Sequence, residues 1–302
     1  LGGGGNKGNQ LIQAGGALNS LSGTLTPLFV GALIGSVTPQ TAMSDVAPLL
    51  FIAMGVFVSA FIALSFIAIP EPHLRKAGHE KEKFSHSPWN FRHTVLGVIG
   101  IFVYVGIEIG IPGTLNFYLA DPTEKGAGLL ANGAAIGGAI AAIYWLLMLV
   151  GRSASSVISG KVATRTQLIV CFRNSYLFYI NRNLHSKRIT VSMPGYSVEN
   201  GFEMASVPVS ALFLVLCGLC TSIMWGGIFN LAVEGLGKYT AQASGIFMMM
   251  VVGGGIFPLL QQFISDAVGY MASYWLIIAL LAYLLFYGLI GCKNVNKDIP
   301  VE

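Results

Sequence analysis

The sequence has little charge. Only 10% of its 302 residues are Asp, Glu, Lys or Arg, whereas hydrophobic residues make up 54% and the mean hydropathy is +0.70. A soluble domain usually carries about 25% charged residues, so the composition excludes an ordinary soluble domain and predicts a membrane protein. The net charge of +4 is small and lies in polar segments, so we expect no nucleic acid as a partner.

Cysteine and histidine are also scarce. The pair Cys217 and Cys220 lies inside an apolar run without a second pair, so we expect neither a disulfide framework nor a metal site. An enzyme embedded in the membrane needs a nucleophile–base pair or a cluster of metal ligands within the spans. The five histidines lie in or beside loops, which leaves such an enzyme only as a weaker alternative; they are His73, His79, His86, His93 and His185.

Seven apolar stretches are long enough to cross a bilayer, since a crossing helix needs about 20 residues. The stretches are too continuous for the alternating pattern of a β-barrel, so we expect an all-α membrane protein. They are residues 11–35, 46–69, 94–119, 127–150, 207–233, 241–264 and 271–292. A polar linker, 70–92, follows the second stretch, and a shorter polar loop is expected at 152–165.

Residues 166–206 do not fit this pattern, because they begin apolar and then turn polar and basic in the run CFRNSYLFYINRNLHSK. If 167–180 still occupies a crossing, there are about eight positions. Twelve of the 17 Lys and Arg, Arg152 among them, then fall on one side, and only Lys125 falls on the other. The positive-inside rule makes the first side cytoplasmic. Both chain ends are therefore predicted in the cytoplasm, with Thr41 and Lys297 on opposite sides. Residues 170–189 are not expected to form a well-packed transmembrane helix.

Three stretches resemble the sugar–cation symporters of the major facilitator superfamily, in the branch of the fucose permease and the glucose/galactose transporter. They are QLIQAGGALNSLSGTLTPLF (10–29), YVGIEIGIPGTLNFYL (104–119) and SIMWGGIFNLAVEGLGKYTAQASGIFMMMVVGGGIFPLLQQFISDAVG (222–269). They occur in the order that the family has.

This resemblance implies a partial major facilitator fold that lacks the first four of twelve helices. Residues 1–69 would be the last two helices of the N-terminal bundle, 70–93 the central cytoplasmic loop and 94–302 the C-terminal six-helix bundle. The ninth helix of the family would be corrupted at 170–189, and a frameshift is one hypothesis for that run.

The resemblance also implies a function. We expect secondary active transport of a monosaccharide of the fucose, glucose or galactose type, by cation symport with alternating access. The coupling cation would be H⁺, or less readily Na⁺, and no other cofactor is expected. The protein would be a monomeric, multi-pass protein of the lipid bilayer, in a bacterial inner membrane. A non-transporting remnant of such a transporter remains an alternative.

Glu108 lies in the middle of the span 94–119, where a carboxylate costs a few kcal/mol and usually faces a water-filled path or a partner. Tyr104 lies four residues earlier and shares its helix face. The pair is interpreted as part of a sugar site or cation path. The alternative is a carboxylate that is satisfied by another helix and has no role in transport.

Asn19 forms a small polar stripe with Ser22, Gly23 and Thr26 at helical spacing. The resembling family places an Asn in its cavity at this point. Hydrogen bonding between helices is the competing interpretation. Gln13 projects from a different face and is a weaker candidate.

Trp225 and Asn230 flank a glycine pair in the run WGGIFN. The glycines can open the helix so that the indole stacks on a sugar and the amide binds its hydroxyls. In a straight helix the two side chains point to different faces, and anchoring at the lipid interface is the alternative for Trp225. Further polar candidates compete with ordinary contacts between helices; they are Asn116, Asn132, Gln261 and Gln262.

Overall fold

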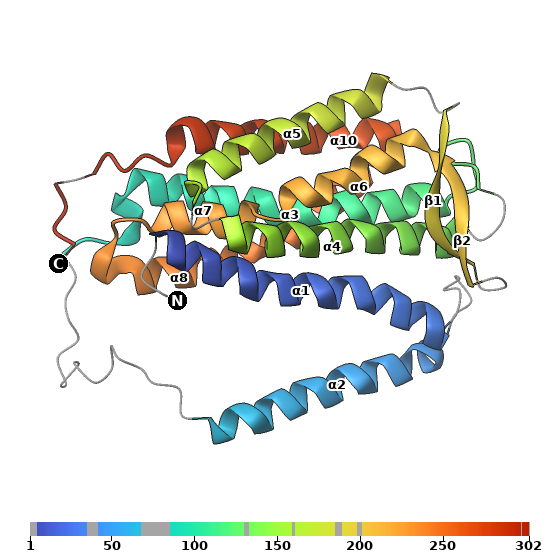
Figure 1. Ribbon diagram of the computed structural model, residues 1–302, viewed down its shortest axis with the longest axis horizontal. Coiled ribbons are helices and arrows are strands. Elements are labelled where there is room, and N and C mark those ends of the chain that lie inside the picture. Colours follow the sequence, from blue (N-terminus) through green and yellow to red (C-terminus); the bar gives the residue numbers. More distant parts are fainter. Residues whose placement is uncertain are drawn as a thin grey trace.

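The computed structural model describes residues 5–34, 42–67, 85–129, 133–158, 161–184, 189–197, 201–296 and 298–301. It is mostly helical, with one small sheet, in agreement with the expected membrane fold. The long helices run roughly parallel or antiparallel to one another, and the sheet lies at one end of them (Figure 1).

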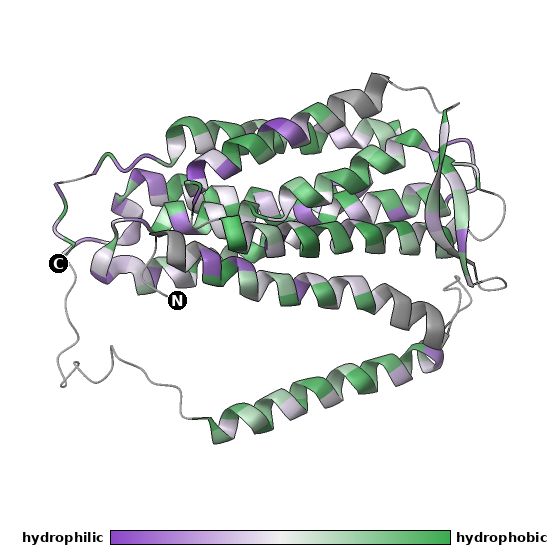
Figure 2. Cartoon of the chain, viewed as in Figure 1, coloured by the Kyte–Doolittle hydropathy of each residue, from purple (hydrophilic) through white to green (hydrophobic). Residues whose placement is uncertain are grey.

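The first two helices differ in how they pack. Helix α1 (Gly5–Ile34) lies along α4, whereas α2 (Met43–Phe66) is splayed away from the bundle and makes its main contact with α1 (Figure 1). None of the described residues of α2 is buried, although the helix is apolar along its length (Figure 2). Position 41, one of the two positions of the topology prediction, lies outside the described residues, as does 297.

The remaining helices pack around α3 (Arg92–Ala120), which follows a short 3-10 turn, η1 (Pro88–Asn90). Helix α3 contacts α4 (Gly133–Ile158), α6 (Val209–Thr221), α7 (Met224–Val233), α9 (Gly253–Val268) and α10 (Tyr270–Phe286). The other short elements are η2 (Gly237–Tyr239), α8 (Thr240–Met249), η3 (Met250–Val252) and a π-helical turn, η4 (Tyr287–Gly291).

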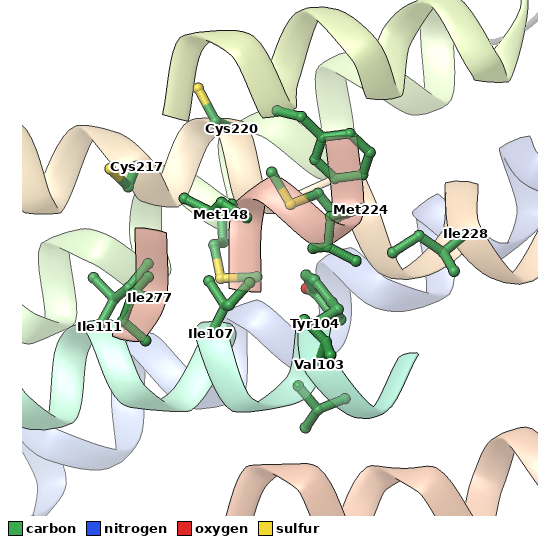
Figure 3. Packing of buried hydrophobic residues seen from close by; sticks show 14 of the residues in the cluster. Val103, Tyr104, Ile107, Ile111, Met148, Cys217, Cys220, Met224, Ile228 and Ile277 are labelled. Carbon is green, nitrogen blue, oxygen red and sulfur yellow. The ribbon is translucent and has the colours of Figure 1, made fainter. Parts of the chain in front are cut away.

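The core of this bundle is formed by side chains that the helical pattern points inward. Ile107 and Tyr104 of α3 face Met148 of α4 and Met224 of α7 (Figure 3), and all four are fully buried. Between membrane helices, van der Waals contact between such side chains favours close packing. The core therefore fixes α3, α4 and α7 relative to one another.

Six helical stretches in the described part of the chain are long and apolar enough to cross a membrane. They are Met43–Phe66, Arg92–Ala120, Gly133–Ile158, Val209–Val233, Gly237–Val268 and Tyr270–Gly291. Helices α1 and α5 are also long, but they do not belong to this set. Together they make the eight helix positions that the sequence predicts.

The run that was expected to break the fold forms helix α5 (Thr164–Leu184) instead. Leu168, Phe172 and Ser175 recur at helical spacing and are buried against α6, α7 and α10. A helix thus forms through Leu184, and part of one face packs against its neighbours, whereas residues 185–188 lie outside the described residues. The helix still exposes Arg173, and it is too polar to count among the six candidate spans.

A β-hairpin, which the sequence reading did not foresee, follows α5. Strands β1 (Thr190–Ser197) and β2 (Gly201–Pro208) pair antiparallel, from Thr190 opposite Pro208 to Ser197 opposite Gly201. Met193, Ala205 and Val207 are buried, and β1 contacts α4. The alternation of buried and exposed residues along β2 is the reason that this segment is a strand.

Helix α4 is longer than expected. It continues to Ile158, so the predicted polar loop 152–165 begins inside a helix. No proline interrupts the run after Gly151, and small Ser and Ala residues let the helix continue. Arg152 therefore lies in the bundle and not in a cytoplasmic loop, which removes it from the twelve basic residues of the topology argument.

Candidate functional site

A cavity of about 280 Å³ lies between α1 and the helices that pack against it. Its wall is formed by α1, α3, α4, α7 and one residue of η3. The lining residues are Ile12, Gln13, Gly16, Asn19, Val105, Glu108, Arg152, Trp225, Gly226 and Val251. The wall is apolar with a few converging polar groups, which is the usual composition of a site for a small molecule.

A buried ion pair lies on this wall. Arg152 Nη2 of α4 donates to Glu108 Oε1 of α3 at 2.8 Å, and both residues are less than a tenth exposed. Nη2 also lies 3.4 Å from the hydroxyl oxygen of Tyr104, which is fully buried behind the cavity. A carboxylate in the middle of a membrane span needs a partner of opposite charge, and Arg152 is that partner for Glu108.

Arg152 also bonds to two other elements. Its Nε donates to the backbone oxygen of Ser222 at 3.0 Å. Its Nη1 donates to the backbone oxygen of Gly16 at 2.8 Å and to Ser20 Oγ at 2.9 Å, both on α1. One guanidinium therefore joins α1, α3 and the segment between α6 and α7.

The segment between α6 and α7 supplies two backbone acceptors, and that of Ile223 also accepts from the backbone N–H of Gly227. Helix α6 ends at Thr221 and α7 begins at Met224. The backbone oxygen of Ser222 accepts from Arg152, and that of Ile223 accepts from Gln13 Nε2 of α1 at 3.0 Å. The break thus binds two polar side chains of the cavity wall and places Trp225 at the cavity.

Comparison with known proteins gives the fold and its relatives. The chain is 34% identical over 284 residues to a glucose/galactose transporter of Brucella abortus, covering 92% of this chain and 62% of that protein. It is 30% identical over 306 residues to a putative glucose/galactose transporter of Helicobacter pylori, covering 95% and 66%. The structure matches the crystal structure of the Escherichia coli fucose:proton symporter with a TM-score of 0.69 and 17% identity, over 94% of this chain and 68% of that one.

The chain has the fold of a solved major facilitator superfamily transporter. It spans about two thirds of the length of the relatives that it matches. No family model matches it. The relatives named here are transporters and not enzymes, which agrees with the prediction that the chain is not an enzyme.

In this major facilitator fold, four of the predicted site residues line the cavity together: Glu108, Gln13, Asn19 and Trp225. Tyr104 lies next to them through its contact with Arg152. Gln13 and Asn19 project from different parts of the α1 surface, as expected, yet both reach the same cavity because α1 passes along its edge.

Three other predicted residues lie elsewhere. Asn230 is buried in α7 and does not line the cavity. Asn116 lies against Gly137 of α4, and Gln261 lies against Gly110 of α3, with its Nε2 3.5 Å from Ser273 Oγ. Asn116 and Gln261 therefore lie against neighbouring helices, and one side-chain oxygen of each of the three residues is buried without a hydrogen-bond partner among the described residues. Asn132 lies outside the described residues.

Arg152 is the site residue that sequence reasoning missed. Its signal was present, because a mid-span carboxylate requires a cation and Arg152 follows directly on an apolar run. Because Arg152 was assigned to the expected polar loop 152–165, it was not considered as the partner of Glu108. In the described part of the chain, no cluster of three or more His, Cys, Asp or Glu side chains could hold a metal ion.

Proposed function

We propose that this chain binds a monosaccharide in the cavity and carries it across the membrane by cation symport with alternating access. The observation that carries the proposal is the buried Glu108–Arg152 pair on a cavity wall that also holds Trp225, Gln13 and Asn19. A carboxylate oxygen and amides suit sugar hydroxyls, and an indole suits the apolar face of a sugar ring.

The substrate class and the coupling ion are inferred from the relatives. Two of them are named as glucose/galactose transporters, and the fold matches that of a fucose:proton symporter. We therefore propose a neutral hexose or deoxyhexose as substrate and H⁺ as the coupling ion, with Na⁺ as the alternative. The protein would be a multi-pass, monomeric protein of a bacterial inner membrane with both ends in the cytoplasm.

The roles of the helices follow the same proposal. Helices α1 and α2 (1–69) would belong to the N-terminal bundle and 94–302 to the C-terminal bundle, with 70–93 as the loop between them. The cavity then lies at the interface of the two bundles, where transporters with repeated halves expose a substrate alternately to each side.

The test measures binding and transport separately. The chain is purified and reconstituted, and binding of D-glucose, D-galactose and L-fucose is measured at equilibrium, followed by counterflow of the radiolabelled sugars. A chimaera that adds the preceding part of the Brucella abortus relative is measured in parallel. Gln262→Ala serves as the control, because Gln262 bonds to Asp266 outside the cavity.

We expect saturable binding of at least one sugar, which Glu108→Gln weakens and Gln262→Ala does not. Binding by the chain with counterflow only in the chimaera would identify the chain as a non-transporting form of the transporter. If neither protein binds any of the three sugars, the proposed substrate class is wrong.

A further inference from the structure

The guanidinium of Arg152 uses every donor that it has on the protein. An Arg side chain carries five N–H groups, and Arg152 makes five hydrogen bonds: two to α1, two to α3 and one to Ser222. It therefore has no N–H left for a molecule in the cavity, although it lines that cavity. Its arrangement is suited to holding helices and not to binding a ligand.

The contacts of Arg152 with α1 are close on the apolar side as well. A Cβ added at Gly16 would lie 3.2 Å from Cδ of Arg152 and 3.4 Å from its Nε, so the absence of a side chain lets the guanidinium reach the backbone oxygen of that residue. The second bond, to Ser20 Oγ, comes one turn further along the same face. Arg152 thus ties two consecutive turns of α1 to α4.

Glu108 holds Arg152 in this position. It is the acidic partner of Arg152 through Oε1, and its carboxylate also has a hydrogen bond with the side chain of Tyr104. Glu108 also lines the cavity, so a ligand there can reach the carboxylate that anchors the arginine. A hydroxyl that bonds to this carboxylate competes with Nη2 for its charge.

We propose that Arg152 is a positioning residue that latches α1 to the C-terminal helices, and that a ligand hydroxyl on Glu108 opens this latch. The inference rests on the proposed function, because it assigns Glu108 to the ligand. Occupancy of the cavity is thereby coupled to movement of α1 relative to α4. Since coupling is reciprocal, the closed latch lowers ligand affinity and the ligand loosens the latch.

The experiment follows the distance between α1 and α4 in the full chain. Spin labels are placed at Leu18→Cys and Val157→Cys, which are both exposed, after the four native cysteines are replaced by serine or alanine. Pulsed electron resonance gives the distance distribution with and without D-galactose in lipid nanodiscs. Equilibrium binding and counterflow of D-galactose are measured on the same variants.

Two substitutions separate the two parts of the latch. Arg152→Lys keeps a charge for Glu108 but lacks the planar fork that reaches Gly16 and Ser20. We expect a broader distribution of α1–α4 distances, a galactose affinity between those of the wild type and Arg152→Gln, and slower counterflow. Arg152→Gln also removes the competitor for Glu108, so we expect a broad distance together with galactose affinity raised about fivefold or more, the usual lower bound of such coupling.

The matched control is Arg165→Lys. Arg165 of α5 donates hydrogen bonds to the backbone oxygens of Gly288 and Leu289. It does not line the cavity. It is a structural arginine between two other helices. We expect it to leave the α1–α4 distance and galactose affinity unchanged.

The outcomes that overturn the proposal are specific. Weaker galactose binding by Arg152→Gln would mean that Arg152 itself binds the ligand. A narrow, unchanged distance in both Arg152 variants would mean that it is no latch. If Arg152→Gln does not fold, the double variant Glu108→Gln/Arg152→Gln leaves no unpaired buried charge, and a narrow distance in that variant overturns the proposal.

The failure of the proposed function gives a different pattern. If the wild-type chain binds no sugar, the binding measurements contradict the proposed function and do not test the latch. The sugar-free distances of wild type, Arg152→Lys and Arg165→Lys still decide whether Arg152 holds α1. In the opposite case, where galactose binds but leaves the wild-type distance unchanged, the latch is not opened by the ligand and the proposal is wrong.

Discussion

Trp225 stacks on Phe229 within α7, with ring centroids 5.4 Å apart and ring planes 8° apart. Phe229 in turn meets Phe247 of α8 edge to face. The indole at the cavity is therefore held by Phe229, which Phe247 supports in turn, and it presents a fixed face. We expect Trp225→Ala to weaken galactose binding about tenfold, since an aromatic contact contributes about 0.5–1.5 kcal/mol beyond area.

Equilibrium binding on the purified chain measures this effect. Trp225→Phe should keep most of the affinity, because a ring remains. Trp275→Phe is the control, because Trp275 of α10 is mostly exposed and does not line the cavity. Equal affinity for wild type and Trp225→Ala would remove Trp225 from the site.

Glu108→Gln should impair sugar uptake more than it impairs expression in the membrane. Gln keeps the size and the hydrogen-bonding capacity but cannot ionise, so it separates charge from packing. If Glu108 accepts only sugar hydroxyls, binding weakens while coupling survives. If it belongs to the cation path, sugar exchange persists while uphill uptake fails.

Counterflow and uphill uptake in proteoliposomes with an imposed pH gradient distinguish these cases. Wild-type values for binding, exchange and uphill uptake would make Glu108 a structural residue. The site assignment on α3 would then be wrong.

Gly151→Ala should destabilise the protein by about 1–3 kcal/mol, which is the usual cost of forcing extra atoms into a packed interior. A Cβ at this position would lie 2.8 Å from Cβ of Ser222 and 2.9 Å from the backbone oxygen of Leu219, and the latter belongs to rigid helix backbone. Thermal unfolding in detergent measures the change.

Gly138→Ala is the matched control on the same helix, since its Cβ would have no neighbour within 4 Å. Alanine favours a helix over glycine by about 1 kcal/mol, so this variant should be neutral or slightly more stable. A similar melting temperature for the two variants would show that α4 and α6 can separate at little cost.

The cavity should reject acidic sugars. The one arginine on its wall is saturated by protein acceptors, and Glu108 adds negative charge beside it. We expect D-galacturonate to compete with labelled D-galactose at least tenfold more weakly than unlabelled galactose, because an unpaired charge is costly to bury. If D-galacturonate competes as well as unlabelled galactose, a positively charged side chain in the cavity must be free to pair with its carboxylate.

The topology prediction can be measured at described positions. Lys125 follows α3 and Lys293 follows η4. The segments that follow α3 and α10 lie at opposite ends of the bundle (Figure 1). Single cysteines at these two positions, in a cysteine-free background, should react with an impermeant maleimide from opposite sides. The sequence-based pair Thr41 and Lys297 should behave in the same way. Labelling of both positions from one side would contradict the eight-crossing arrangement.

Much of the site could be predicted from local spacing. Glu108 and Tyr104 share a helix face by their separation of four residues. The glycine pair after Trp225 does not open the helix as expected, because α7 runs regularly through both glycines and the break lies before Met224. The partner of Glu108 could not be found in this way, because Arg152 lies 44 residues away and its direction depends on where α4 ends. Helix ends are the least reliable part of such a prediction.

The positions of Asn230, Asn116 and Gln261 show a second limit of predicting site residues from the sequence. A polar side chain in an apolar span signals that it needs a partner, but it does not say whether the partner is a ligand or a neighbouring helix. The hairpin and α5 show a third limit, since both are stabilised by tertiary contacts with α4, α6 and α10 that no local pattern contains.

The polar helix α5 has a consequence for how the chain enters the membrane. A translocon releases a segment sideways into lipid when that segment is apolar enough, and arginines at mid-helix disfavour this step. The helices that bury Leu168 and Phe172 are synthesised after α5, because α6, α7 and α10 follow it in the chain. We therefore expect stable integration of α5 to depend on these later helices.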